Sequence, residues 1–351
     1  MVLIDTYRGS PDELAAFVNS VWEHSYAGKM TFPRWTPEFF QWQFRIGERE
    51  NPQNLLAACE GETLVGVLLG ADYSFRSPAG IHSGSHWSWL SVHPDHRGKG
   101  IAKALDEERV RRQRAAGSRL VVSYRYVGSR HSLAERPDRN SPSKKFHRKV
   151  GFWARVLNPP RFSRWNSNRL EGWLARLAAP MARVPRTTSS DSIIREFAIE
   201  DLDACLGLLA ASYSSMMLAI HWDRDLLRHQ LCGSPVGQTL ILEENGSISG
   251  LVNFHILPFQ DRSVENVGLF DLIAFGEGSV KNQVLLIDAA LTRMVTQDVI
   301  LALKIRCGDA AVWPMIRARF IPQPAESFLV LQWIGDPVEI PSKAPVHVLW
   351  R

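Results

Sequence analysis

Hydrophobic and polar positions alternate between helical and strand spacing along the first half of the chain, which predicts a mixed α/β layer. Ser10–Glu13 combines a capping serine, a proline and two acids, and apolar side chains then recur at helical spacing as far as Trp22. Thr36–Glu38 repeats this start signal. Residues 54–60 and 62–73 predict two strands joined by a hairpin.

The pattern continues with alternating strands and helices. Residues 86–92 predict a strand, and a helix follows from Gly100 to near Gly117. A strand rich in valine and tyrosine is expected at 120–127, and a short helix at 143–149. With a first strand at 2–6, the predicted order is β-α-α-β-β-β-α-β-α.

The second half repeats this order after a break. Residues 159–192 are rich in proline, serine and threonine, and we interpret them as a linker that contains a short amphipathic helix at 168–179. The apolar face of that helix suits packing at the domain junction, with a membrane surface as the alternative. From residue 193 the order of elements recurs, which predicts domains at 1–158 and 193–351 around the linker.

Composition limits the partners and the compartment. The net charge of +5 suits a phosphate-rich cofactor, a nucleic acid or an anionic membrane, and does not choose among them. The four cysteines form no C-x-x-C pair, which predicts free thiols, no metal site and a cytoplasmic location. No stretch approaches the roughly 18 apolar residues of a membrane span, so none is expected.

The segment from Leu90 to Leu105 carries the most specific chemistry. It has the pattern of a strand end, a basic loop with two glycines and the first turn of a helix. Gly98 and Gly100 let backbone amides approach an anion, and the helix N-terminus adds unpaired donors. Since Arg97 and the nearby lysines add full charges, the segment predicts a diphosphate-binding loop.

A second segment follows as Asn140-x-x-Ser143-x-x-x-His147-x-x-x-Gly151-Phe152. Together, and in this order, the two segments resemble the cofactor signature and the later helix of the GNAT acyltransferase superfamily. That family usually has alanine and tyrosine where this chain has Ser143 and His147. The resemblance covers Val2 to Phe152, and reaches the second half only through the order of elements.

The resemblance implies an α/β (α+β) fold of two GNAT-like domains, each a mixed, mostly antiparallel twisted sheet flanked by helices. The loop expected at Phe275–Asn282 lacks the arginine and contains Glu277, so the second domain is interpreted as a degenerate copy. The implied co-substrate is acetyl-CoA or another acyl-CoA, with no metal. The residues implied to bind it are Leu90, Ser91, Val92, Arg97, Gly98, Lys99, Gly100, Ile101, Ala102, Lys103, Asn140 and Ser143.

The implied activity is N-acyl transfer, in which an amine directly attacks the thioester and a backbone N–H stabilises the oxyanion. A lysine-like amine has a pKa of about 10.4, so a base or a water chain is required. Residues 83–93 contain no carboxylate, which leaves His86 as the base candidate, with His82 and Asp72 as further options. His86 is equally interpreted as an ordinary strand residue.

His147 stands where the family places its tyrosine, so three interpretations compete. It acts as general acid for the leaving thiolate, it only binds the cofactor, or the site is inactive. The changed residue also motivates an alternative function, a non-catalytic acyl-CoA-binding sensor or scaffold. An RNA partner is disfavoured, because the loop already accounts for part of the basic charge. The sequence leaves the amine acceptor unidentified and does not decide between monomer and homodimer.

Overall fold

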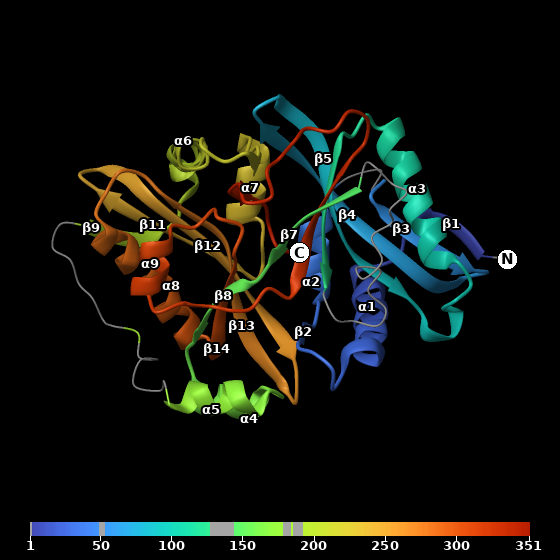
Figure 1. The fold of residues 1–351 in the computed structure, drawn as a ribbon, viewed down its shortest axis with the longest axis horizontal. Helices are drawn as coiled ribbons and strands as arrows, with labels where there is room; N and C mark the ends of the chain where they lie inside the picture. Colours follow the sequence, from blue (N-terminus) through green and yellow to red (C-terminus); the bar gives the residue numbers. More distant parts are fainter. Residues whose placement is uncertain (1, 49–52, 127–143, 178–183, 185–191) are drawn as a thin grey trace.

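The computed structural model describes residues 2–48, 53–126, 144–177, 184 and 192–351 (Figure 1). Two mixed sheets lie side by side, each with helices packed against it (Figure 1). The predicted α/β class, with two mixed sheets flanked by helices, is confirmed. No helix in the described ranges is long and apolar enough to cross a membrane.

The first sheet has the strand order β1-β3-β4-β5-β6-β16-β7, with β10 and β17 attached beside β4. Most neighbours are antiparallel, and β5 pairs with β6 in parallel. The strands are β1 (Val2–Thr6), β3 (Leu55–Glu60), β4 (Thr63–Ser77), β5 (Gly80–Val92), β6 (Leu120–Tyr126), β7 (Lys144–Val150), β10 (Leu218–Ile220), β16 (Ser327–Trp333) and β17 (Val346–His347).

The second sheet has the order β15-β8-β14-β13-β12-β11-β9, and β2 pairs with β12. In this sheet β13 and β14 pair in parallel. The strands are β2 (Phe32–Pro33), β8 (Phe152–Val156), β9 (Ser192–Glu196), β11 (Gly237–Glu244), β12 (Ser247–Gln260), β13 (Val264–Phe275), β14 (Val299–Ile305) and β15 (Ile321–Pro322).

Helices cover both faces of the first sheet, so its strands bury side chains on both sides. Alternate residues of β3 face opposite ways: Leu55 packs in the cluster of α1 and α2, and Leu56 packs in the cluster of α3. The helices are α1 (Pro11–Tyr26), α2 (Pro37–Phe44), α3 (Ile101–Ala115), α4 (Pro159–Trp165), α5 (Arg169–Leu177), α6 (Leu202–Ser212), α7 (Arg224–Cys232), α8 (Val280–Thr296) and α9 (Val312–Arg317).

The predicted starts of the first two helices are confirmed. The Ser10 Oγ accepts a hydrogen bond from the Glu13 backbone N–H at 3.1 Å, and the Thr36 Oγ1 accepts one from Phe39 at 3.2 Å. Proline follows each cap at the first helical position. The helix α1 packs against β5, and its Ser25 contacts the loop that follows β5.

The helix predicted at 143–149 is wrong. Residues Lys144–Val150 form strand β7, which pairs antiparallel with β16 from the far end of the sequence. The segment is strongly basic and lacks an apolar stripe at helical spacing, so local sequence does not stabilise a helix. The exposed edge of β16 offers backbone donors and acceptors instead, and pairing there satisfies them.

The sheets do not divide where the sequence suggested a boundary. Strand β8 lies before residue 158 but belongs to the second sheet, where it pairs with β14. Strand β16, expected in the second domain, lies between β6 and β7 in the first sheet. The two halves therefore exchange strands, while the proposed boundaries at 158 and 192 themselves stay a prediction.

Candidate functional site

The first sheet opens between β5 and β6. The two strands pair in parallel from Gly84 opposite Leu120 to Trp87 opposite Ser123. Strand β5 then continues to Val92 and β6 to Tyr126 without further pairing between them. Backbone groups along the end of β5 are therefore available on one side to an extended ligand, in the manner of an added strand.

A β-bulge lies on β5 at this opening. Val67 of β4 is opposite Ser91 and Leu69 is opposite Ser88, so Leu68 faces both Trp89 and Leu90. Trp89 has a φ of 54°, in the left-handed region that bulky residues rarely adopt. Its indole packs edge-on against Trp35 at 5.2 Å and Phe44 at 5.1 Å between ring centroids. This packing holds the bulge, which leaves one extra residue of β5 out of the strand ladder.

The predicted diphosphate loop follows β5 and leads into α3. Gly98 has a φ of 78° and Gly100 a φ of 81°, a conformation that glycine adopts without steric cost. Gly100 is the N-cap of α3 and supplies no side-chain bond to the first turn. The first N–H groups of α3 therefore have no side-chain cap and carry the positive end of the helix dipole, which suits an anion.

Arg97 connects this loop to α1 and β5 through hydrogen bonds. Its Nη2 donates to the Ser25 Oγ of α1 at 2.6 Å, and its Nε donates to the Val92 carbonyl at 3.3 Å. The Trp22 indole also donates to the Ser91 Oγ at 3.0 Å. The sequence pointed to the charge of Arg97, whereas the tertiary structure also makes it a link between the loop, β5 and α1.

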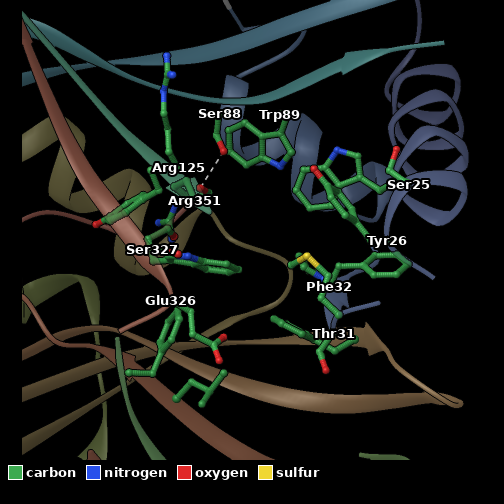
Figure 2. A pocket seen from close by; sticks show the side chains of 18 of the residues that line it. Ser25, Tyr26, Thr31, Phe32, Ser88, Trp89, Arg125, Glu326, Ser327 and Arg351 are labelled. Carbon is green, nitrogen blue, oxygen red and sulfur yellow. Dashed lines mark hydrogen bonds between the residues drawn. The ribbon is translucent and has the colours of Figure 1, made fainter. Parts of the chain in front are cut away.

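A single cavity of about 2250 Å³ connects the opening of the sheet with this loop. Its walls come from α1, β5, β6, α3 and the second sheet, and Figure 2 shows side chains that line it. Ser91 and Lys99 are not part of the wall, and Asn140 and Ser143 lie outside the described residues. The predicted residues that the structure brings together there are Leu90, Val92, Arg97, Gly98, Gly100, Ile101, Ala102 and Lys103.

Much of the cavity wall is apolar and aromatic. Tyr26 and Phe32 lie on one side, and Trp89 lies above them near the bulge (Figure 2). Phe259 and Trp350 close the wall from the second half of the chain, with their ring centroids 6.3 Å apart. The sequence signals for the loop did not reveal this compartment, because its side chains come from distant elements.

Arg351 reaches the same opening from the second half of the chain. Its carbonyl oxygen accepts a hydrogen bond from the Ser88 Oγ at 2.9 Å (Figure 2). Its guanidinium donates to both carboxylate oxygens of Asp271, at 2.8 and 2.7 Å, and lies over the Trp42 ring. Burial raises the pKa of Asp271, but Arg351 and His255 outweigh it and hold that pKa below its usual range.

The two histidines named by the sequence do not line the cavity. His147 is buried on β7, which is separated from β5 by β6 and β16. His86 is buried on β5 with its ring edge-on to Tyr124 at 5.6 Å. Burial, and then the charge of Arg351, lowers the pKa of His86 to about 3. Their catalytic roles stay predictions.

The two further base candidates are engaged elsewhere. His82 makes a 2.8 Å hydrogen bond with the Ser77 Oγ, and burial lowers its pKa. Asp72 accepts a hydrogen bond from Asn54 and lines a separate cavity of about 460 Å³. Neither side chain faces the opening between β5 and β6.

The matching loop of the second domain offers a poorer anion site. Ser279 caps α8 by accepting from the Asn282 backbone N–H at 3.2 Å. The Glu244 carboxylate accepts a hydrogen bond from the Asn282 side chain, which brings a negative charge beside the start of α8. Over the described ranges, no group of three histidine, cysteine, aspartate or glutamate side chains is arranged to hold a metal ion.

Comparisons with known proteins agree with this geometry. The sequence model of the acetyltransferase (GNAT) family matches residues 15–152. Solved structures of Saccharomyces cerevisiae N-myristoyltransferase with bound myristoyl-CoA match the fold with TM-scores of 0.76 and 0.75 at 14% and 15% identity. They cover 100% of this chain and 89% and 85% of theirs. No curated protein sequence matches.

Residues 15–152 therefore resemble the acetyltransferase (GNAT) family, and the whole chain shares the fold of these N-myristoyltransferase structures. The match to the first domain includes the opened sheet, the bulge and the glycine loop. At these identities the structural likeness defines the fold, and the chemistry has to be argued from the site itself.

Proposed function

We propose that this protein is an acyl-CoA-dependent N-acyltransferase, and that its reaction takes place at the opening between β5 and β6. One observation supports this above all. The unpaired end of β5, the bulge at Trp89 and the open N-terminus of α3 all border one cavity. An extended acyl-pantetheine with a diphosphate at one end is complementary to that arrangement.

In the proposed reaction, the diphosphate binds at Gly98–Ile101 and the pantetheine arm lies along Leu90–Val92. A neutral amine nitrogen attacks the thioester carbonyl, and backbone N–H groups near the bulge stabilise the oxyanion. Collapse of the tetrahedral intermediate forms the amide and breaks the carbon–sulfur bond. The ammonium loses one proton and the departing thiolate gains one, which gives free CoA.

Proton transfer is the part of the proposal that needs a relay. His147 as proton donor and His86 as base both lie outside the cavity wall, so each would act only through intervening groups or water. If His147 donates the proton, His147→Phe lowers kcat while acetyl-CoA still binds. An unchanged kcat in that variant overturns the assignment.

Acetyl-CoA is the donor that the sequence favours, and a longer acyl chain is a second candidate. The cavity exceeds the roughly 300–1,000 Å³ of ordinary small-molecule sites, and much of its wall is aromatic. The structural neighbours hold myristoyl-CoA. A turnover series from acetyl-CoA to myristoyl-CoA with one amine distinguishes the two, because kcat/KM rises with chain length only if the apolar wall receives the acyl group.

The alternative is an acyl-CoA-binding sensor or scaffold, and a two-stage experiment separates it from an enzyme. A ligand present at a hundred times its Kd adds about 2.7 kcal/mol of apparent stability, which a thermal shift detects. No shift with CoA, acetyl-CoA or longer acyl-CoAs contradicts the whole proposal. A clear shift without release of free thiol over a panel of amines supports the sensor.

A further inference from the structure

An arginine on the inner face of α3 has a donor without a partner. Arg109 follows Ile101 and Leu105 at four-residue spacing, on the face of α3 that packs against the sheet, and is 3% exposed. Its Nε and Nη2 donate to the Asp106 Oδ1 at 2.9 and 2.7 Å. Nη2 also donates to the Gln332 Oε1 at 2.8 Å, which fixes the guanidinium in place.

The remaining nitrogen of Arg109, Nη1, is buried and has no hydrogen-bond partner among the residues that the structure describes. Leaving a buried charged donor unpaired costs folding free energy, so natural proteins rarely keep one without a reason. Arg109 is also part of the wall of the large cavity. A ligand group that fills this part of the cavity would remove the cost.

The charge around Arg109 decides what kind of group that is. Arg125 of β6 lies on the same wall, together with Asp106 and Gln332. Burial lowers the pKa of Arg125, the Asp106 carboxylate opposes that shift, and the Arg109 charge adds to it. Among the described side chains around Arg109, two guanidiniums accompany one carboxylate, a balance that favours an anion over a cation.

This positive wall is distinct from the glycine loop. Asp106 is six positions and Arg109 nine positions beyond Gly100, so at 1.5 Å per residue the pair lies about 9–14 Å along α3 from the helix N-terminus. The same cavity therefore has two positive positions, one at each end of this stretch of α3. They match one ligand that carries two separate anionic groups.

We infer that Arg109 and Arg125 form a second anion subsite, which binds an anionic group of the acyl-CoA other than its diphosphate. This inference rests on the proposed function. Two groups of the ligand have the required chemistry, the 3′-phosphate on the ribose and a carboxylate at the end of a dicarboxylic acyl chain. Both present oxygen acceptors to which a guanidinium donates.

Calorimetric binding of four ligands to the full chain tests the inference. The ligands are CoA, 3′-dephospho-CoA, acetyl-CoA and succinyl-CoA, and the variants are Arg109→Gln and Arg125→Gln. Arg111→Gln is the matched control, because it removes an exposed arginine of the same helix that pairs with Glu108. If the 3′-phosphate binds here, the unmodified chain prefers CoA to 3′-dephospho-CoA by on the order of tenfold, about 1.4 kcal/mol.

In each cavity variant the ratio of the Kd for 3′-dephospho-CoA to the Kd for CoA then falls close to one. The Arg111→Gln control keeps the ratio of the unmodified chain. If the carboxylate binds here, the preference for succinyl-CoA over acetyl-CoA changes in the same way. Unchanged ratios in both cavity variants, or equal weakening of all four ligands, overturn the inference while leaving the proposed function intact. Failure of every ligand to bind the unmodified chain overturns the proposed function and this inference with it. Arg125→Gln keeps the test decisive if Arg109→Gln does not fold.

Discussion

The Ser88 hydroxyl donates to the carbonyl oxygen of Arg351 at 2.9 Å, next to the bulge that opens the first sheet. The side chain of the same arginine forms a two-bond ion pair with Asp271 of β13, in the second sheet. One residue thus connects the two sheets at the edge of the cavity. The position of β5 at the site depends on a contact from the far half of the chain.

Asp271→Asn is expected to destabilise the fold by about 3–5 kcal/mol, because it leaves the Arg351 guanidinium buried without its counter-charge. Urea unfolding measures the loss. The double variant Asp271→Leu with Arg351→Met replaces the ion pair by two apolar side chains. It is expected to recover part of the lost stability, since both buried charges are then gone. An Asp271→Asn variant as stable as the unmodified protein contradicts the role assigned to this pair.

Loss of stability at low pH provides a separate test of His86. Its folded pKa of about 3 lies below the value near 6.5 of an unfolded histidine, so its contribution is present above pH 6.5 and is lost as the pH falls towards 3. His86→Phe is expected to remove a slope of up to about 1.4 kcal/mol per pH unit in that window. Urea unfolding between pH 4 and 7 measures it.

The exposed His24 of α1 supplies the control for that experiment. His24→Phe is expected to leave the slope of stability against pH as it is in the unmodified protein. Equal slopes in the His86→Phe variant and the unmodified protein would show that His86 is not buried in its neutral form.

The glycine loop is tested by Gly100→Ala. The φ of 81° at this position costs an alanine roughly 1–2 kcal/mol, although no atom lies within 4 Å of the added Cβ. The strain shifts the N–H groups at the start of α3, so the Kd for CoA is expected to rise about tenfold. Gly61→Ala is the matched control, because Gly61 has a φ of 62° with equally open space and lies in the β3–β4 hairpin. If both variants change the Kd for CoA equally, the glycine loop is not the CoA-binding element.

The apolar wall predicts a change in donor preference. Leu303 of β14 lines the cavity from the second sheet, and Leu303→Trp narrows it without adding a polar group. If an acyl chain lies against this wall, kcat/KM for myristoyl-CoA falls at least tenfold while that for acetyl-CoA stays within about twofold. Steady-state assays over the donor series measure this. If Leu303→Trp raises only the KM of the amine, the wall binds the acceptor amine and not the acyl chain.

Local sequence was sufficient where a short segment determines its own geometry. The caps at Ser10 and Thr36 and the glycines of the loop act through neighbouring backbone groups, so their residues predict them directly. The loop residues that the sequence singled out, Arg97 to Lys103, border the cavity with the exception of Lys99. These parts of the site depend on contacts within one segment or between neighbouring strands.

Other features depend on which distant segments meet. The sequence predicted a helix at 143–149, but residues 144–150 form strand β7 because the edge of β16 is available to pair with them. The aromatic wall, the Asp271–Arg351 pair and the Arg109–Gln332 contact each join residues far apart in the chain. No period or motif marks such partners, since each side chain is ordinary in its own neighbourhood.

The sequence by itself therefore determined the α/β class, the repeated order of elements and the glycine loop before α3, because backbone periodicity and glycine conformation are local properties. The tertiary structure alone decided the exchange of strands between the sheets, the shape of the cavity and the buried charge pairs. Those features follow from long-range packing, in which burial and pairing outweigh local preference.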